Sequence, residues 1–212
     1  MENLVDISIN CNNSIKLSGN KVIYIDPFRI DKPMNDADYI FCTHSHYDHF
    51  SKEDILKVKK ENTKIITVQS SKEDAENMVG KDNVLIVSPN EEYNIDEISF
   101  KTTKAYNIGK PFHPKGNNWV GYIINLNNNT YYIAGDTDDL EELHSLDVDV
   151  AFLPVGGTYT MDYKEAANLA NNMNAKIYIP THYGAVAGDI EDGNRFKMLV
   201  KNKEVRVYIN KK

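Results

Sequence analysis

The sequence predicts a layered α/β or α+β sandwich that contains two β-sheets. Ten short runs of β-forming residues, each bounded by Asn, Asp, Gly or Pro, recur along the 212 residues. Segments with helical patterning alternate with these runs, and no Pro-, Gly- or Ser-rich linker separates them. Ten strands imply two sheets. Because no linker divides the chain, we expect both sheets to belong to a single layered domain that spans residues 1–212.

The expected elements follow from local signals. Strands are expected at residues 21–26, 39–43, 64–68, 84–87, 98–102, 120–125, 130–134, 148–153, 176–179 and 205–209. Helices are expected at residues 52–60, 72–79 and 163–173, behind the capping pairs Ser51/Asp54, Ser71/Asp74 and Asp162/Glu165, and near residues 195–200. Asn128 and Asn129 predict a hairpin turn, since Asn tolerates a positive φ.

The composition excludes several classes of protein. The 24 Lys and Arg residues against 31 Asp and Glu residues give a net charge of −7, which argues against a nucleic-acid partner. No apolar run reaches the length of a membrane span, and residues 1–6 lack the basic and apolar parts of a secretory signal. We therefore expect a cytoplasmic protein with no membrane partner. Cys11 and Cys42 are too few for a disulfide scaffold.

One segment carries most of the chemistry. His44, His46, Asp48 and His49 follow an apolar run in the spacing H-x-H-x-D-H. Residues two apart on an extended segment point to the same side, so His44 and His46 can bind one ion. The turn that follows can direct Asp48 and His49 toward a second ion. The alternative is a solvated loop that happens to be rich in histidine.

Two further candidate ligands follow apolar strands. Asp136 comes after an apolar run ending in Ala134-Gly135, where a carboxylate can place one oxygen on each of two cations. Its alternative role is a helix cap. His182 follows the strand at residues 176–179, and its alternative role is an ordinary hydrogen-bonded residue at a strand end.

These motifs, in this order, resemble the metallo-β-lactamase superfamily. The likeness rests on H-x-H-x-D-H at residues 44–49, Gly-Asp-Thr at 135–137 and Pro-Thr-His-Tyr at 180–183, and it covers nearly the whole chain. Segments 25–28, 121–123 and 153–161 are most similar to small single-domain hydrolases of the ascorbate-phosphate lactonase branch. The resemblance implies a four-layer αββα sandwich with a dinuclear metal site at one edge.

The resemblance also implies a role for each ligand. It assigns His44, His46 and a third histidine to the first metal, with Asp48, His49 and His182 on the second and Asp136 bridging the two. Relatives place the third histidine in the loop after a strand that matches residues 100–105. Asn107 occupies the expected position, and His113 between Pro111 and Pro114 is the substitute. Asn107 could instead face the metal, and His113 could contact the substrate.

The remaining candidates carry weaker signals. Asn107, Tyr159 and Tyr183 are candidates for contact with the substrate. Asp26 is a candidate carboxylate for orienting a metal-bound imidazole, and its alternative role is a turn at the strand end before Pro27. The loop at residues 156–160 is equally consistent with a glycine turn before a helix cap. Lys110 and Lys115 flank His113, and one interpretation is that they attract an anionic substrate. His144 lies on a polar helical stretch and is left out of the site.

The predicted chemistry is hydrolysis of a small molecule. Two divalent ions activate a water for attack on an ester, lactone or phosphate ester, and Asp48 is placed to accept the proton of that water. The imidazole-rich ligand set favours Zn²⁺, while Mn²⁺ and Fe²⁺ remain alternatives. A phosphodiesterase or nuclease of the same superfamily and a non-catalytic metal-binding protein are the competing interpretations.

Overall fold

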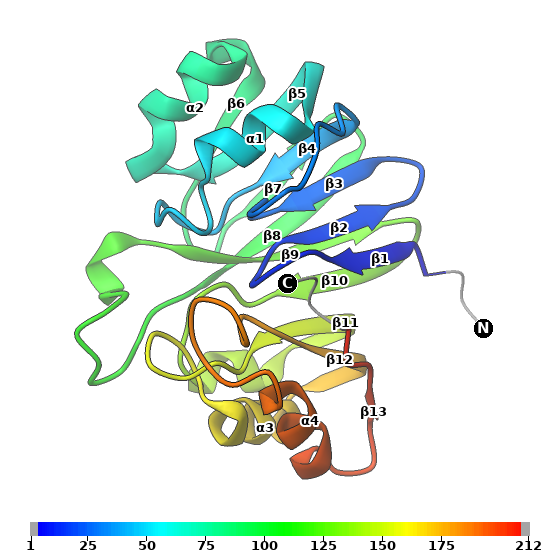
Figure 1. The fold of residues 1–212 in the computed structure, drawn as a ribbon, viewed down its shortest axis with the longest axis vertical. Helices are drawn as coiled ribbons and strands as arrows, with labels where there is room; N and C mark the ends of the chain where they lie inside the picture. The colour runs from blue at the N-terminus through cyan, green and yellow to red at the C-terminus, as the bar shows by residue number, and fades with distance from the viewer. Residues whose placement is uncertain (1–3, 209–212) are drawn as a thin grey trace.

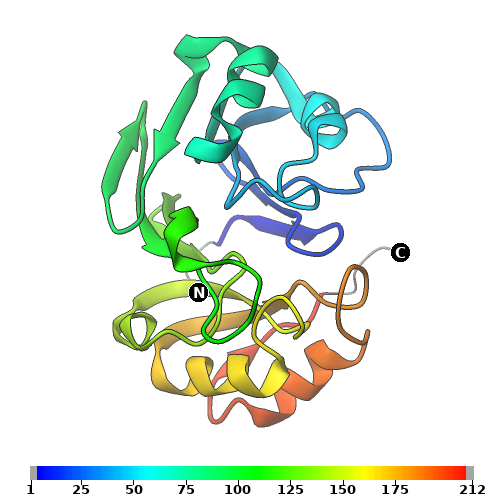
Figure 2. The ribbon, with the colours of Figure 1, turned by 90° about the vertical axis from the view of Figure 1, so that its left-hand side faces the viewer.

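Two β-sheets lie face to face, and helices cover the outer face of each (Figures 1 and 2). The computed structural model describes residues 4–208. The first sheet has six strands in the order β1 (Asp6–Ile9), β2 (Ile15–Ser18), β3 (Val22–Ile25), β4 (Ala37–Phe41), β5 (Lys59–Val68) and β6 (Val84–Val87). Its strands are antiparallel from β1 to β3 and parallel from β3 to β6.

The second sheet has seven strands and a similar change of direction. Its order is β13 (Glu204–Val205), β12 (Asn174–Thr181), β11 (Asp147–Pro154), β10 (Asn129–Ile133), β9 (Val120–Leu126), β8 (Ile98–Lys104) and β7 (Glu92–Ile95). Strands β7 to β10 are antiparallel, and β10 to β13 are parallel. The expected αββα sandwich is confirmed.

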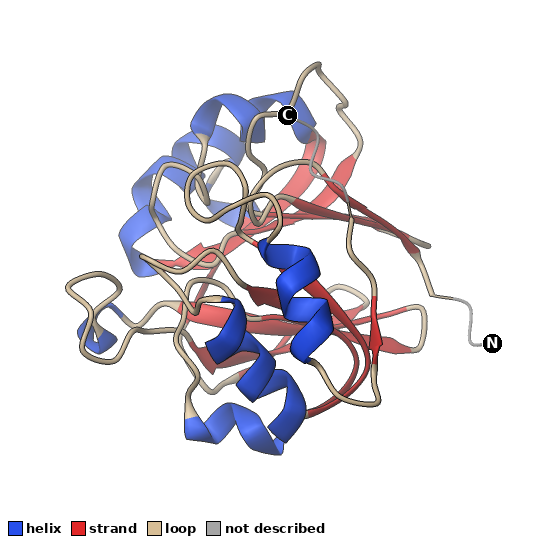
Figure 3. Cartoon of the chain, turned by 60° about the horizontal axis from the view of Figure 1, so that its bottom comes forward, coloured by secondary structure: helices blue, strands red, loops and turns tan. Residues whose placement is uncertain are grey.

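The helices form the two outer layers, as Figure 3 shows. Helices α1 (Lys52–Val58) and α2 (Lys72–Val79) cover the first sheet, and α3 (Tyr163–Asn172) and α4 (Asp192–Leu199) cover the second. Strand β4 explains how one sequence serves two layers. Phe41 packs between the sheets, whereas its neighbours Ile40 and Cys42 pack toward α1, because successive side chains of a strand alternate between faces.

Several predicted boundaries and elements were wrong. Strands β1, β2 and β7 were not predicted, because each is only four residues long and its two apolar residues are too few to establish an alternating pattern. Lys59 and Lys60 begin β5 instead of ending α1. The hairpin turn uses Asn127 and Asn128, which have φ of 51° and 61°, while Asn129 already belongs to β10.

The last helix and the last strand of the chain also differ from prediction. Helix α4 begins at Asp192, three residues before the predicted start at residue 195. The strand predicted at residues 205–209 is reduced to β13, and residue 209 lies outside the described residues. None of the helices in the described part of the chain combines the length and apolar composition needed to cross a bilayer.

A buried carboxylate attaches α1 to the loop that follows β3. Asp54 accepts hydrogen bonds from the backbone N–H groups of Arg29 and Ile30, both at 2.9 Å, and from the Ser51 hydroxyl at 2.6 Å. Ser51 caps the helix as predicted by accepting from the Asp54 backbone N–H. The Asp54 side chain, however, binds the neighbouring loop, so this carboxylate joins two segments and does more than support a cap.

We expect Asp54→Ala to lower the free energy of unfolding by about 2–3 kcal/mol, because two backbone N–H groups lose a charged acceptor. Urea denaturation followed by circular dichroism measures the change. Glu53→Ala is the matched control on the same turn: its side chain is 80% exposed, so the change should stay below about 0.5 kcal/mol. Equal losses for the two variants would contradict this role.

Candidate metal centre

The loop between β4 and α1 contributes the H-x-H-x-D-H segment. It leaves the carboxyl end of β4 and turns back on itself, since the backbone N–H groups of His49 and Phe50 both donate to the His46 carbonyl, at 3.0 and 2.8 Å. His44, Asp48 and His49 are buried, whereas His46 is exposed at the mouth. The turn thus places four candidate ligands around one point.

The second sheet supplies the other three candidates from the loops after β8, β10 and β12. His113, Asp136 and His182 are all buried. His113 and His182 have φ of 51° and 54°, a left-handed conformation that non-glycine residues rarely adopt and that occurs often at functional sites. A Cβ at Gly156 would lie 2.1 Å from the His182 carbonyl oxygen, so the glycine allows this close approach. The backbone at Gly156 therefore packs directly against the backbone of His182.

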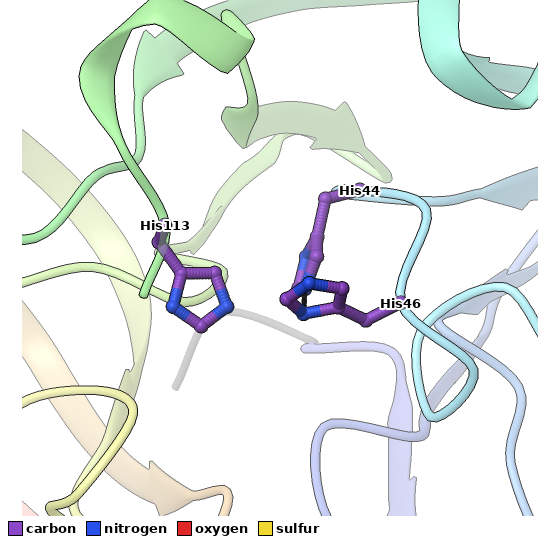
Figure 4. A group of neighbouring side chains, drawn as sticks. All are labelled: His44, His46 and His113. Carbon is purple, nitrogen blue, oxygen red and sulfur yellow. Dashed lines mark hydrogen bonds between the residues drawn. The ribbon is translucent and has the colours of Figure 1, made fainter. Parts of the chain in front are cut away.

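The seven candidate side chains form three overlapping groups. Within each group the ligand atoms all lie within 4.8 Å of one another, and the groups are His44/His46/His113, His44/His49/Asp136 and Asp48/His49/His182. Figure 4 shows the first group, in which His44 and His46 come from one loop and His113 reaches them from another. The structure thus brings together every residue that the sequence predicted as a ligand, His113 included.

Asp136 lies at the centre of the cluster. Its Oδ1 is 3.3 Å from His49 Nε2, and its Oδ2 is 3.2 Å from His113 Nε2 and 3.3 Å from His182 Nε2. Asp48 Oδ2 is 3.4 Å from the Nε2 atoms of both His49 and His182. A carboxylate that faces histidines of all three groups is well placed to bridge two cations.

The chemistry of these atoms fits divalent cations. Nε2 of His49, His113 and His182 and Oδ1 of Asp136 are buried without a hydrogen-bond partner among the described residues. Buried polar atoms are normally paired, so a convergent set of unpaired nitrogen and oxygen atoms indicates a ligand. Imidazole nitrogens and carboxylate oxygens are the donors that Zn²⁺ and similar ions bind.

The electrostatics of the cluster point the same way. Burial alone lowers the pKa of His49 and raises that of Asp136, yet their mutual attraction and the neighbouring charges reverse both shifts. The pKa of His182 likewise rises to about 9, because Asp136 and Asp48 outweigh its burial. Burial and the charge on His49 keep the pKa of His44 well below its ordinary value. The carboxylates therefore create a buried region that favours positive charge.

Asp26 holds the cluster from behind. Its Oδ2 accepts from His49 Nδ1 at 2.7 Å and from the Thr43 hydroxyl at 2.7 Å, and its Oδ1 accepts from the Thr43 backbone N–H at 2.8 Å. An acceptor on Nδ1 leaves Nε2 of His49 as the free donor to an ion. The structure thus places Asp26 where the sequence predicted it, in hydrogen-bond contact with one of the candidate ligands.

Sequence reasoning missed two asparagines in the β1–β2 loop. Asn12 Nδ2 donates to Asp48 Oδ2 at 2.7 Å, and the Asn12 carbonyl accepts from the His182 backbone N–H at 3.0 Å. Asn13 Nδ2 donates to Asp26 Oδ2 at 2.7 Å. Neither residue belongs to a ligand motif, and only the adjacent asparagines before a strand hinted at an unusual turn. Asn12 orients Asp48 and the backbone of His182 together.

Three of the weaker candidates can be placed directly. Asn107 lies beside His113, 3.3 Å from its Nδ1, and donates to the Tyr159 carbonyl at 2.7 Å, so it supports the His113 loop. The Tyr159 side chain lines the pocket at the cluster. Tyr183 is buried against α4, and its hydroxyl donates to the Tyr208 carbonyl. Its predicted contact with substrate was therefore wrong, because its ring packs into the outer core.

His144 lies outside the cluster, whereas Trp119 packs against it. His144 Nε2 donates to Asp139 Oδ1 at 2.7 Å, and His144 belongs to none of the three ligand groups. Trp119 was not predicted near the site, but its ring centroid lies 4.6 Å from that of His44 and 4.7 Å from that of His46. It is the single tryptophan of the chain, so its fluorescence reports on this cluster.

Comparisons with known proteins agree with this geometry. Residues 11–182 match the family described as the beta-lactamase superfamily domain. A UPF0173 metal-dependent hydrolase of Thermococcus onnurineus is 30% identical over 206 residues, covering 90% of this chain and 89% of that protein. One of Nanoarchaeum equitans is 33% identical over 195 residues, covering 88% and 87%.

Solved structures share the fold. A protein of Parabacteroides distasonis, assigned in its crystal structure as a metal-dependent hydrolase, superposes with a TM-score of 0.81 at 29% identity and covers 98% of this chain and 94% of its own. Igni18, a metallo hydrolase of Ignicoccus hospitalis, superposes with a TM-score of 0.77 at 21% identity, covering 99% and 97%. The second likeness concerns the fold alone.

We expect Asn12→Ala to weaken metal binding by roughly 10–100-fold, because Asp48 loses the amide that orients it. Competition with a chromophoric zinc chelator measures the affinity. Asn125→Ala, which removes an exposed amide bonded to Ser99, is the matched control and should bind metal like the wild type. Wild-type affinity in the Asn12 variant would show that Asp48 needs no such support.

Proposed function

The chain belongs to the beta-lactamase superfamily as a metal-dependent hydrolase, and from that membership we propose a dinuclear mechanism acting on a small molecule. The observation that carries the proposal is the placement of Asp136 between three histidines from separate loops. The proposed substrate is a small ester, lactone or phosphate ester, and the proposed metal is Zn²⁺. The imidazole-rich donor set supports zinc ahead of Mn²⁺ and Fe²⁺.

The residues divide between two ions. His44, His46 and His113 would hold the first ion, Asp48, His49 and His182 would hold the second, and Asp136 would bridge the two. Two bound divalent ions would lower the pKa of the attacking water and polarise the bond under attack. Asp26 fixes the tautomer of His49, and Asn12 holds Asp48.

Asp48 is the proposed proton acceptor. Its carboxylate lines the pocket, and its pKa lies well below the ordinary value, because the positive charge on His49 and the nearby His182 ring outweigh its burial. An ionised carboxylate at the pocket accepts the proton of the attacking water and returns it to the leaving group. The same residue thus combines a ligand role with a catalytic one.

The pocket supports a small substrate over a nucleic acid. Its volume is about 270 Å³, just below the roughly 300–1,000 Å³ typical of small-molecule sites. The acidic balance of the chain further disfavours a nuclease, which needs to neutralise a phosphate backbone. A non-catalytic metal-binding role is the remaining alternative, and turnover assays distinguish it.

We expect protein purified without chelator and reconstituted with Zn²⁺ to hold about two ions per chain. His113→Ala should lower this toward one ion while the fold survives, because the first ion loses one of its three histidines. Elemental analysis with circular dichroism measures both quantities. His144→Ala removes a histidine outside the ligand groups and should leave the content unchanged. Two retained ions in the His113 variant would make His113 a substrate-pocket residue.

We expect Asp48→Asn to lower kcat by roughly 10²–10⁴-fold, because an amide cannot accept the proton of the water. A screen of chromogenic esters, lactones and phosphodiesters identifies a substrate, and kcat is then measured at matched metal content. Metal analysis of the same samples separates lost proton transfer from lost metal. A wild-type rate at full metal content would remove Asp48 from the mechanism.

A further inference from the structure

The pocket above the cluster has an apolar outer wall. The candidate ligands form its floor, while Tyr47, Phe112, Tyr159 and Val186 line its sides. The rings of Phe112 and Tyr159 meet edge to face, with centroids 4.7 Å apart and planes at 76°. Phe112 and Tyr47 are 39% and 66% exposed, so large aromatic surfaces face the opening. Such surfaces gain free energy when an apolar group covers them.

No lysine or arginine occurs among the described residues that line this pocket. Lys110 donates instead to the Asp138 carboxylate, to the Thr160 carbonyl at 2.8 Å and to Glu165 at 3.3 Å. Its ammonium group is therefore used within the protein. Lys115 lies over the Tyr106 ring, 5.1 Å from its centroid. The interpretation that these lysines attract an anion does not fit their positions.

The charged groups of this pocket lie on its floor. Asp48 and Asp136 line the floor, whereas Tyr47, Phe112, Tyr159 and Val186 of the outer wall carry no charge. A charged group of the substrate that lies against this wall would lose hydration without gaining a partner, which is costly.

We infer that the substrate of this site is a small uncharged ester or lactone with an apolar group beside the bond that is cleaved. This inference rests on the proposed hydrolase function and narrows it. The apolar group would lie between Phe112, Tyr159 and Val186, and the ester would face Asp48. A phosphate group remote from the cleaved bond, as in the phosphorylated lactones for which the resembling branch is named, would lack a cationic partner in this wall.

The test is a pair of ligands that differ by one sulfonate group, which carries a negative charge. Binding of benzamide and of 4-carbamoylbenzenesulfonate to the Zn²⁺-loaded protein is followed by the fluorescence of Trp119, which packs against His44 and His46. We expect benzamide to bind at least about tenfold more tightly, because the sulfonate is desolvated without a partner. Equal or tighter binding of the sulfonate, or no measurable binding of benzamide, would overturn the inference.

Two variants probe the wall itself. Phe112→Ala should weaken benzamide binding by roughly tenfold, because apolar contact is lost. Val186→Lys should lower the ratio of benzamide affinity to sulfonate affinity by roughly threefold or more, because it adds a cation to the wall. Met198→Lys places the same charge on α4, where Met198 is 76% exposed, and should change neither affinity. An effect of Met198→Lys equal to that of Val186→Lys would show that the preference reflects total charge and not this pocket.

Turnover is measured in parallel with phenyl acetate, an uncharged lactone and bis(4-nitrophenyl) phosphate. Hydrolysis of the phosphodiester in preference to the uncharged substrates would overturn the inference and leave the hydrolase function standing. Tight, selective binding of benzamide without turnover of any of the three would instead count against the hydrolase function and leave the selectivity of the pocket established. The two failures are therefore distinct.

Discussion

The buried Asp26 carboxylate is the interaction on which the metal centre depends. It is 0% exposed and receives hydrogen bonds from Thr43 and His49 in the loop after β4 and from Asn13 in the β1–β2 loop. A buried carboxylate without partners would be prohibitively unfavourable, so these donors must all stay in place. The segments that carry them are thereby fixed relative to one another, and the His49 imidazole is fixed with them.

The layered fold brings the remaining ligands to the same place. Strands β4, β10 and β12 all end at this edge, and the residues after them enter the space between the two sheets. The sheets can meet closely here because Phe41, Phe100 and Tyr122 pack edge to face in the central core, with centroids 5.1 Å apart for the Phe41 pairs. The Tyr122 hydroxyl also donates to the Cys42 carbonyl, just before the ligand loop. Core packing thus fixes the distance between the two halves of the site.

Sequence reasoning predicted what local patterns encode. His44, His46, Asp48 and His49 are adjacent in the chain, so their convergence needs only a strand and a turn. Asp136 and His182 follow apolar strands, a place where functional residues gather in sheets. Asn12 and Trp119 escaped notice because their roles arise from contacts between distant segments. Tyr183 was misplaced because its neighbour His182 adopts a positive φ and turns away from the strand direction.

The division of the ligands between the two sheets has a consequence for the lifetime of the protein. The groups His44/His46/His113 and Asp48/His49/His182 each combine two residues of the β4–α1 loop, on the first sheet, with one histidine from the second sheet. An ion bound to either group would therefore join the two halves of the sandwich. An ion that binds only the folded state stabilises it in proportion to the logarithm of its free concentration. Chains that lose their ions would open more often along this edge, and proteases cleave open states. The abundance of the protein would then follow the supply of metal.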